Sequence, residues 1–185
     1  MTTWVLLLRG INVGGRNRLP MRDLAALLEG MGLGDVRTLI QSGNVVFTSD
    51  DETPVDPTTL TSTITAAIRE AHGIAPRAML LTAAALRVAI EANPFPEADA
   101  EPATVHLFFL DGVPAAPDLA GLEAVRAPRE RFAIDNAVFY LHAPDGLGRS
   151  KLAERAERLL GVAATARNWS TVSGLARLAA GMADT

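Results

Sequence analysis

The stretch that decides the fold is DVRTLIQSGNVVFTS, residues 35–49. It contains two runs rich in β-branched and apolar residues, 35–41 and 44–49, separated by the dipeptide Ser42-Gly43. Two such runs joined by a short glycine turn predict a β-hairpin. A hairpin this early excludes a sheet made only of parallel strands, because parallel neighbours need a long crossover between them. We therefore expect an α+β protein.

The residues on either side of the hairpin extend this pattern. An apolar run at 3–9 predicts a buried strand, and apolar residues at helical spacing predict helices at 20–32 and 60–71. Residues 76–82 read as a fourth strand. The order β-α-β-β-α-β is that of a ferredoxin-like plait.

The rest of the chain nearly repeats this order. A helix at 83–92 and the helix-breaking Asn93-Pro94-Phe95-Pro96 predict a connector. Strands are expected at 104–110, 129–134, 137–142 and 164–167, with helices near 117–122, 150–160 and 170–182. We predict two tandem ferredoxin-like plaits, or one plait and a degenerate copy, with an extra C-terminal helix. The predicted parts are 1–82, 83–103 and 104–185.

The composition limits the classes of protein. The chain has 185 residues, 49% of them hydrophobic, a formal net charge of −4 and no cysteine. These values predict a globular protein and argue against general nucleic-acid binding. The missing cysteine excludes disulfides, thiolate metal sites and cysteine nucleophiles. The apolar run 4–8 has no basic flank or cleavage site, so we expect a cytoplasmic protein that contacts no membrane.

The glycine-rich stretch LLLRGINVGGRNRLPM, residues 6–21, predicts a ligand site. In a plait the first two strands run parallel, so the loop after the first and the turn after the second lie at the same end of the sheet. The first helix begins there too, and anions favour helix N-termini. The predicted site residues are Arg9, Asn12, Gly14, Gly15, Arg16, Asn17, Gln41, Ser42 and Asn44.

Two alternatives bear on this stretch. Its glycine spacing is that of a P-loop, but it lacks the Lys and the Ser or Thr that contact phosphate and magnesium, and no G-x-G-x-x-G is present. We therefore reject a nucleotide-hydrolysing loop and a dinucleotide fingerprint. The other alternative stays open: a glycine-rich connection whose asparagine side chains satisfy their own backbone.

Two later stretches could add to the site. DGLGRSKL, residues 145–152, places Arg149 and Lys151 at a helix start, either as a second anion contact or as solvated cations of a helix capped by Ser150. TARNWSTV, residues 165–172, combines a charge, an amide and a ring that could stack on a base or a sugar, or could cap a helix and fill the core. Its candidate residues are Arg167, Asn168 and Trp169.

Other chemistry finds no support in the sequence. His72, His106 and His142 lack metal-ligand spacing, so we expect no metal site. Ser42 does not lie in a nucleophile elbow, and no pair of carboxylates suggests a general acid and base. No cofactor is indicated, and the sequence does not decide whether the protein is an enzyme.

Several stretches together resemble a known family. LLRGINVGGRNRLPM, IQSGNVVF, NPF, GLGRSKL and ARNWSTV resemble, in this order, the motifs of the bacterial family called domain of unknown function 1697. The resemblance covers nearly the whole chain and implies an α+β fold, but no activity and no catalytic residue. Besides most of the candidate residues, it includes Gly10, Gly43 and Ser150, whereas Arg16 and Arg18 lie where the pattern is loose.

Three functions follow from these observations. The leading hypothesis is binding of a small anionic or nucleotide-like ligand by the Arg9–Arg18 loop and the Gln41–Asn44 hairpin, with help from Lys151 and Arg167. The second is single-stranded nucleic-acid binding, which needs aromatic side chains exposed on a sheet. The third is a protein-interaction or structural module in which the glycine turns are scaffolding.

Overall fold

The first half of the chain has the predicted order of elements. The structure, a computed structural model, describes residues 1–50 and 56–183. The helix α2 begins after Asp56, whose carboxylate accepts a hydrogen bond from the Thr59 backbone N–H at 2.8 Å. This bond holds the pKa of Asp56 below its ordinary value. The elements of this half are β1 (Thr2–Arg9), α1 (Met21–Gly30), β2 (Gly34–Leu39), β3 (Asn44–Ser49), α2 (Pro57–His72) and β4 (Arg77–Thr82).

The second half follows the same plan after a connecting helix. The sequence did not predict α4, because a four-residue helix is too short to show a helical period. The elements are α3 (Ala83–Glu91), α4 (Glu97–Ala100), β5 (Val105–Leu110), α5 (Leu119–Val125), β6 (Arg131–Asp135), β7 (Val138–His142), the 3₁₀ turn η1 (Leu147–Arg149), α6 (Lys151–Leu160), β8 (Ala164–Asn168) and α7 (Trp169–Ala183).

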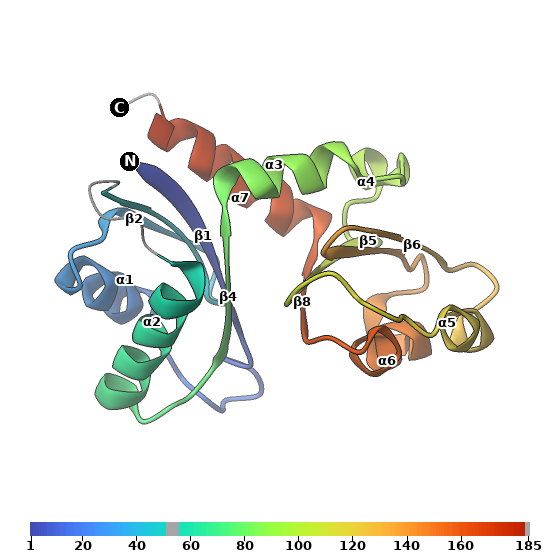
Figure 1. Cartoon of the computed structure of the whole chain (residues 1–185), viewed down its shortest axis with the longest axis horizontal. Helices are drawn as coiled ribbons and strands as arrows, with labels where there is room; N and C mark the ends of the chain where they lie inside the picture. The colour runs from blue at the N-terminus through green and yellow to red at the C-terminus, as the bar shows by residue number, and fades with distance from the viewer. Residues whose placement is uncertain (51–55, 184–185) are drawn as a thin grey trace. The chain divides into compact units, whose positions relative to one another are not determined.

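Each half forms one four-stranded antiparallel sheet. The strand orders are β2-β3-β1-β4 and β6-β7-β5-β8 (Figure 1). Since β1 and β2 both pair antiparallel to β3, they run in the same direction, as the plait requires. The second sheet repeats this arrangement around β5 with all four strands present. The prediction of two tandem ferredoxin-like plaits is confirmed.

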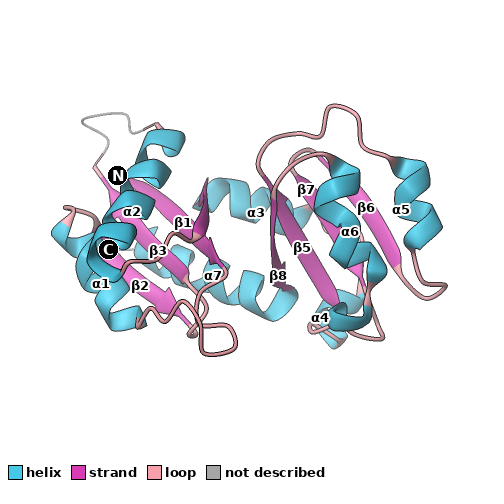
Figure 2. Ribbon diagram, turned by 90° about the horizontal axis from the view of Figure 1, so that it is seen from below, coloured by secondary structure: helices cyan, strands magenta, loops and turns pink. Residues whose placement is uncertain are grey.

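The helices α1 and α2 cover one face of the first sheet and α5 and α6 cover one face of the second, with a hydrophobic core between helices and sheet in each half. Figure 2 shows α1 and α2 over the first sheet and α6 over the second. Leu6 and Leu8 of β1 belong to the first core, and Phe108 and Leu110 of β5 belong to the second. Burying one such side chain stabilises the fold by about 1.5–3 kcal/mol. The aromatic residues expected inside are buried, namely Phe47, Phe108, Phe109, Phe139 and Tyr140.

The chain divides into two compact units. The first unit comprises Met1–Val88 and Gly174–Thr185, and the second comprises Ala89–Ser173. Most of α7 therefore belongs to the first unit, where Gly174 lies so close to β2 that a Cβ on it would be 2.8 Å from Leu39 Cδ2. The boundaries predicted from the sequence, at 82 and 103, follow the order of elements and stay a prediction.

Two properties of the described residues bear on function. Within 1–50 and 56–183, no helix has both the length and the apolar sequence needed to cross a bilayer. In the same residues, no group of three or more histidine or acidic side chains is placed to hold a metal ion.

Candidate functional site

The loop between β1 and α1 meets the turn between β2 and β3. We call residues 10–20 the opening loop and residues 40–43 the β2–β3 turn. The Leu8 N–H donates to the Gly43 carbonyl at 2.8 Å, and Asn12 Nδ2 donates to the Gln41 carbonyl at 3.0 Å. Gly43 has a φ of +72°, and a Cβ there would lie 2.6 Å from Leu8 Cβ. Only glycine fits this position, which places the turn directly against the loop.

The opening loop is a miniature hairpin. The Asn12 N–H donates to the Asn17 carbonyl at 3.1 Å, and the Arg16 N–H donates to the Val13 carbonyl at 3.0 Å. Gly14 and Gly15, between them, have φ values of +57° and +76°. A two-residue hairpin turn with both central residues at positive φ is the type I′ turn, which favours Gly-Gly. The glycines therefore form the hairpin tip and do not wrap a phosphate as a P-loop does.

The asparagine side chains hold this hairpin in place. Asn12 Nδ2 also donates to the Leu19 carbonyl at 2.8 Å, and its Oδ1 accepts from the Leu19 N–H at 2.8 Å. Asn17 Nδ2 donates to the Gly10 carbonyl at 2.8 Å, and Asn44 Nδ2 donates to Ser42 Oγ at 2.7 Å. These bonds match the alternative in which the asparagines satisfy the loop itself. The asparagine side chains therefore fix the shape of the loop through bonds within the protein.

The tip of the opening loop, residues 13–18, is exposed, whereas both of its ends are anchored. Ile11 and Leu19 are 3% and 0% exposed and belong to the first core. Among the residues that the structure describes, the N–H groups of Gly14 and Gly15 have no hydrogen-bond acceptor. A rigid base thus presents unpartnered backbone donors on a solvent-exposed turn.

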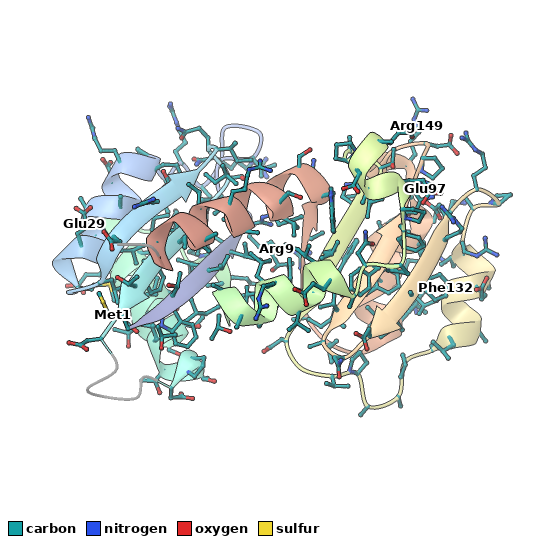
Figure 3. The ribbon with its side chains drawn as sticks, turned by 90° about the horizontal axis from the view of Figure 1, so that it is seen from above. Met1, Arg9, Glu29, Glu97, Phe132 and Arg149 are labelled. Atoms are coloured by element: carbon teal, nitrogen blue, oxygen red, sulfur yellow. The ribbon has the colours of Figure 1, made fainter. Side chains whose placement is uncertain are left out.

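Positively charged residues lie close to these donors in the chain. Arg16 and Arg18 are exposed on the loop, and Arg9 (Figure 3) is exposed at the end of β1. Arg9 also has an interaction within the protein. The helix α1 follows directly and has no side-chain cap at Pro20, so the donors of its first turn are not covered by a side chain of that residue. Guanidinium groups, backbone N–H groups and a helix start all favour an anion.

Two exposed apolar residues lie beside the charges, and the sequence did not single them out. Val13 and Ile40 are 66% and 59% exposed. Their chain neighbours Asn12 and Gln41 are joined by the hydrogen bond described above, which brings the two segments together. Ile40 has a φ of +51°, a strained conformation for a β-branched residue. The sequence gives no signal for it, because isoleucine is not a residue that turns favour.

The remaining candidate residues belong to the second unit. Ser150 caps α6 by accepting from the Ala153 N–H at 2.9 Å, and Lys151 follows it on the surface. Asn168 caps α7, since its Oδ1 accepts from the Thr171 N–H at 3.0 Å, and Trp169 begins that helix half-buried. For residues 145–152 and 165–172, helix capping was the alternative to a ligand contact, and both caps are present.

Arg167 differs from the other candidate cations. It lies on β8, and Arg167 Nη1 donates to the Ala166 carbonyl at 2.8 Å. Burial lowers the pKa of its guanidinium to about 10. The register pairs Arg167 with Leu107, which places it on the sheet face opposite Phe108, whereas α6 and its Lys151 lie on the Phe108 face. The structure therefore does not bring Lys151 and Arg167 to one face of the second sheet.

The comparisons with known proteins agree with this architecture. The model of a family described as protein of unknown function, DUF1697, matches residues 1–140. The chain belongs to the domain of unknown function 1697 family. The family resemblance is thereby confirmed. The match includes the whole opening loop and the β2–β3 turn, whereas the stretches GLGRSKL and ARNWSTV lie beyond it.

A solved structure has the same fold over nearly its whole length. The conserved bacterial protein SP0830 from Streptococcus pneumoniae superimposes with a TM-score of 0.71 at 22% identity, over 96% of this chain and 98% of that one. At this identity the likeness establishes the fold. No curated protein matches the sequence.

Proposed function

We propose that this DUF1697 protein binds a small anionic or nucleotide-like ligand at the tip of the opening loop and the adjacent β2–β3 turn. The observation that carries the proposal is the exposed Gly14-Gly15 turn, whose N–H groups have no acceptor within the described residues. Successive N–H groups in a turn form a concave anion site. Arg16, next to this turn, and Arg18 supply the charge.

The rest of the loop supports this function by making the site rigid. The hydrogen bonds of Asn12 tie the loop to Leu19 and to Gln41, so little conformational freedom is lost when a ligand binds. A guanidinium can contact two oxygens of one phosphate or carboxylate, which gives orientation as well as charge. Lys151, Arg167, Asn168 and Trp169 stay predictions for the same function. A cytoplasmic location is part of the proposal, because small phosphorylated metabolites are found there.

A thermal-shift panel on the purified protein tests the proposal. The panel holds phosphate, sulfate, nucleotides, sugar phosphates and a short single-stranded oligonucleotide. A ligand at one hundred times its Kd adds about 2.7 kcal/mol to the stability and raises the Tm. The double variant R16A/R18A is expected to lose the Tm shift produced by the best ligand. Calorimetry then measures how far the Kd of that ligand rises.

A charge-matched control separates this site from net charge. R155A/R158A removes two exposed arginines from α6, in the second unit, and is expected to keep the shift. If both double variants lose the Tm shift equally, the shift depends on the net charge of the protein and not on this loop. A panel in which no anion shifts the Tm would overturn the proposal.

A second candidate function, a protein contact, is favoured by the exposed side chains of Val13 and Ile40. If V13S/I40N loses a complex that wild type forms, while V113S keeps it, the contact is at this end of the first unit. Val113 is a fair control because it is also 66% exposed but belongs to the second unit. Single-stranded nucleic-acid binding has less support, because the sheet aromatics that could stack on bases are buried.

A further inference from the structure

Three polar side chains of the second unit meet at one guanidinium nitrogen. Arg131 Nη2, on β6, donates to Glu97 Oε1 at 2.5 Å and lies 3.1 Å from His142 Nδ1 on β7. Hydrogen bonds from its own backbone N–H and from Arg131 hold the pKa of Glu97 below its ordinary value. A single arginine thus joins α4, which carries Glu97 (Figure 3), to two neighbouring strands.

The same arginine holds an aromatic residue of the connector. The Arg131 guanidinium lies over the Phe95 ring, 5.2 Å from its centroid, and the Phe95 and His142 rings are 5.9 Å apart. Phe95 is 6% exposed, and Asn93 fixes it by accepting from its N–H at 3.2 Å. We call residues 93–97 the strap. It covers the face of the second sheet opposite the α5 and α6 helices, because His142 pairs with Val105 on that face.

The contacts define the proton on His142. An arginine nitrogen only donates, so His142 Nδ1 must accept, and the neutral ring carries its proton on Nε2. His142 is 7% exposed, and its Nε2 is buried without a hydrogen-bond partner among the described residues. Glu97 Oε2 is likewise buried without a partner there. The cluster thus contains two polar atoms, one on His142 and one on Glu97, that are buried without a partner among the described residues, which costs free energy.

We propose that Arg131 latches the strap onto the second sheet and that protonation of His142 releases the latch. A protonated Nδ1 can no longer accept from Arg131, and two cations then face each other at hydrogen-bond distance. The Arg131 side chain is 49% exposed, so it can turn to solvent, and the strap then loses its links through Glu97 and Phe95 together.

Two charged groups belong to the hydrogen-bonded cluster at His142, as far as the structure describes the chain. They are Arg131 from β6 and Glu97 from α4. Val105 from β5 and Phe95 from the strap are uncharged. Arg167 of β8 lies on the same sheet face, two strands away from His142. With His142 neutral, the Glu97 carboxylate balances the charge of Arg131, but one carboxylate cannot balance both Arg131 and a protonated His142.

Two measurements on the full chain test the latch. The chain has only three histidines, so imidazole ¹⁵N spectra resolve each ring, and His142 is expected as the Nε2–H tautomer at neutral pH. Hydrogen exchange of the Phe95 amide, divided by the rate of an unstructured peptide at the same pH, reports opening of the strap. We expect this protection to fall about tenfold or more between about pH 7.5 and about pH 5.5.

The variant H142N is the matched test, because an asparagine oxygen can accept from Arg131 and does not titrate. Its Phe95 protection is expected to stay constant over the same pH range, whereas H72N, changed in the first unit, behaves as wild type. His106 titrates in all three proteins, so the difference isolates His142. An Nδ1–H tautomer at neutral pH, or the same loss of protection in wild type and H142N, would overturn the proposal. If H142N does not fold, the tautomer of His142 and the hydrogen exchange of the Phe95 amide in the wild-type protein still test the proposal.

Discussion

The two plaits contain the same connection with opposite chemistry. In the first, the opening loop leads from the central strand β1 to α1 and carries Arg16 and Arg18. In the second, residues 111–118 lead from the central strand β5 to α5 and carry Asp111 and Asp118. Asp118 caps α5 by accepting from the Gly121 N–H at 2.8 Å, whereas α1 has no side-chain cap.

The difference teaches that the proposed anion site belongs to one loop and not to the plait. In the second plait the protein's own carboxylate occupies the helix start and accepts from the Gly121 N–H, which disfavours an external anion there. In the first plait no side chain caps α1, where the Asp23 N–H donates to the Pro20 carbonyl at 3.1 Å, and two exposed guanidinium groups lie on the loop before the helix. The predictions below test this contrast, from the largest expected effect to the smallest.

The contact between the opening loop and the β2–β3 turn is expected to be the most sensitive point. G43A places a Cβ 2.6 Å from Leu8 Cβ and 2.7 Å from Ile11 Cδ1 at a φ of +72°. We expect a loss of about 2–4 kcal/mol in the free energy of unfolding, measured in urea, from overpacking and backbone strain together.

G14A is the matched control for this change. Gly14 also has a positive φ, +57°, but a Cβ there would meet nothing within 4 Å. Only the backbone penalty applies, so the expected loss is about 1 kcal/mol. If G43A and G14A lower the free energy of unfolding equally, the close contact of the β2–β3 turn with Leu8 and Ile11 adds no cost.

The asparagines of the opening loop are expected to differ in importance. N12G keeps the left-handed backbone, φ +53°, but removes three hydrogen bonds, so we expect a loss of about 2–3 kcal/mol in unfolding free energy. N17G removes one exposed bond, to Gly10, and is expected to cost about 0.5–1 kcal/mol. Urea unfolding of both variants decides, and a reversed order would contradict the anchoring role of Asn12.

The presence of a side-chain cap can be reversed at the two helix starts by substitution. D118A removes the cap of α5 and is expected to lower the unfolding free energy by about 1 kcal/mol. P20D introduces a cap and a carboxylate at α1, which should weaken phosphate binding in calorimetry because the added charge competes for the same donors. Unchanged binding in P20D would place the anion away from the start of α1.

The second plait is expected to be the more sensitive to acid. Burial lowers the pKa of His106, partly offset by a hydrogen bond with the Thr104 backbone. Below its ordinary value of 6.5, the unfolded chain therefore binds more protons than the folded one, and the free energy of unfolding falls as the pH falls. Urea midpoints at about pH 7.5 and about pH 5.5 measure the effect. In H106N the fall should be smaller, and an equal fall would assign it to other groups.

The sequence predicted most of the fold because the signals are local. Runs such as 3–9 and 44–49 and the helical spacing of apolar residues lie within single elements, so each strand and helix could be read by itself. The meeting of the opening loop with the β2–β3 turn followed from the plait order. The type I′ turn at Gly14-Gly15 also has a local signal, since Gly-Gly favours it, but it was not predicted from the sequence.

The details of the sites could not be read in this way. The strained backbone of Ile40 depends on how the turn packs, not on any preference of isoleucine. Glu97, Arg131 and His142 lie far apart in the sequence, and only the pairing of β6 with β7 and the path of the connector bring them together. Nothing in the residue types indicates that an arginine and a histidine share a hydrogen bond.

The division of α7 between the units has a consequence for biosynthesis. The four strands of the first plait are complete at Thr82, but the helix segment that packs against Leu39 begins at Gly174. The second plait is in effect an insertion into the first. During translation at 5–20 residues per second, the side of β2 that receives this segment waits on the order of ten seconds for its cover. The part of the protein that starts first on the ribosome is therefore the part that finishes last.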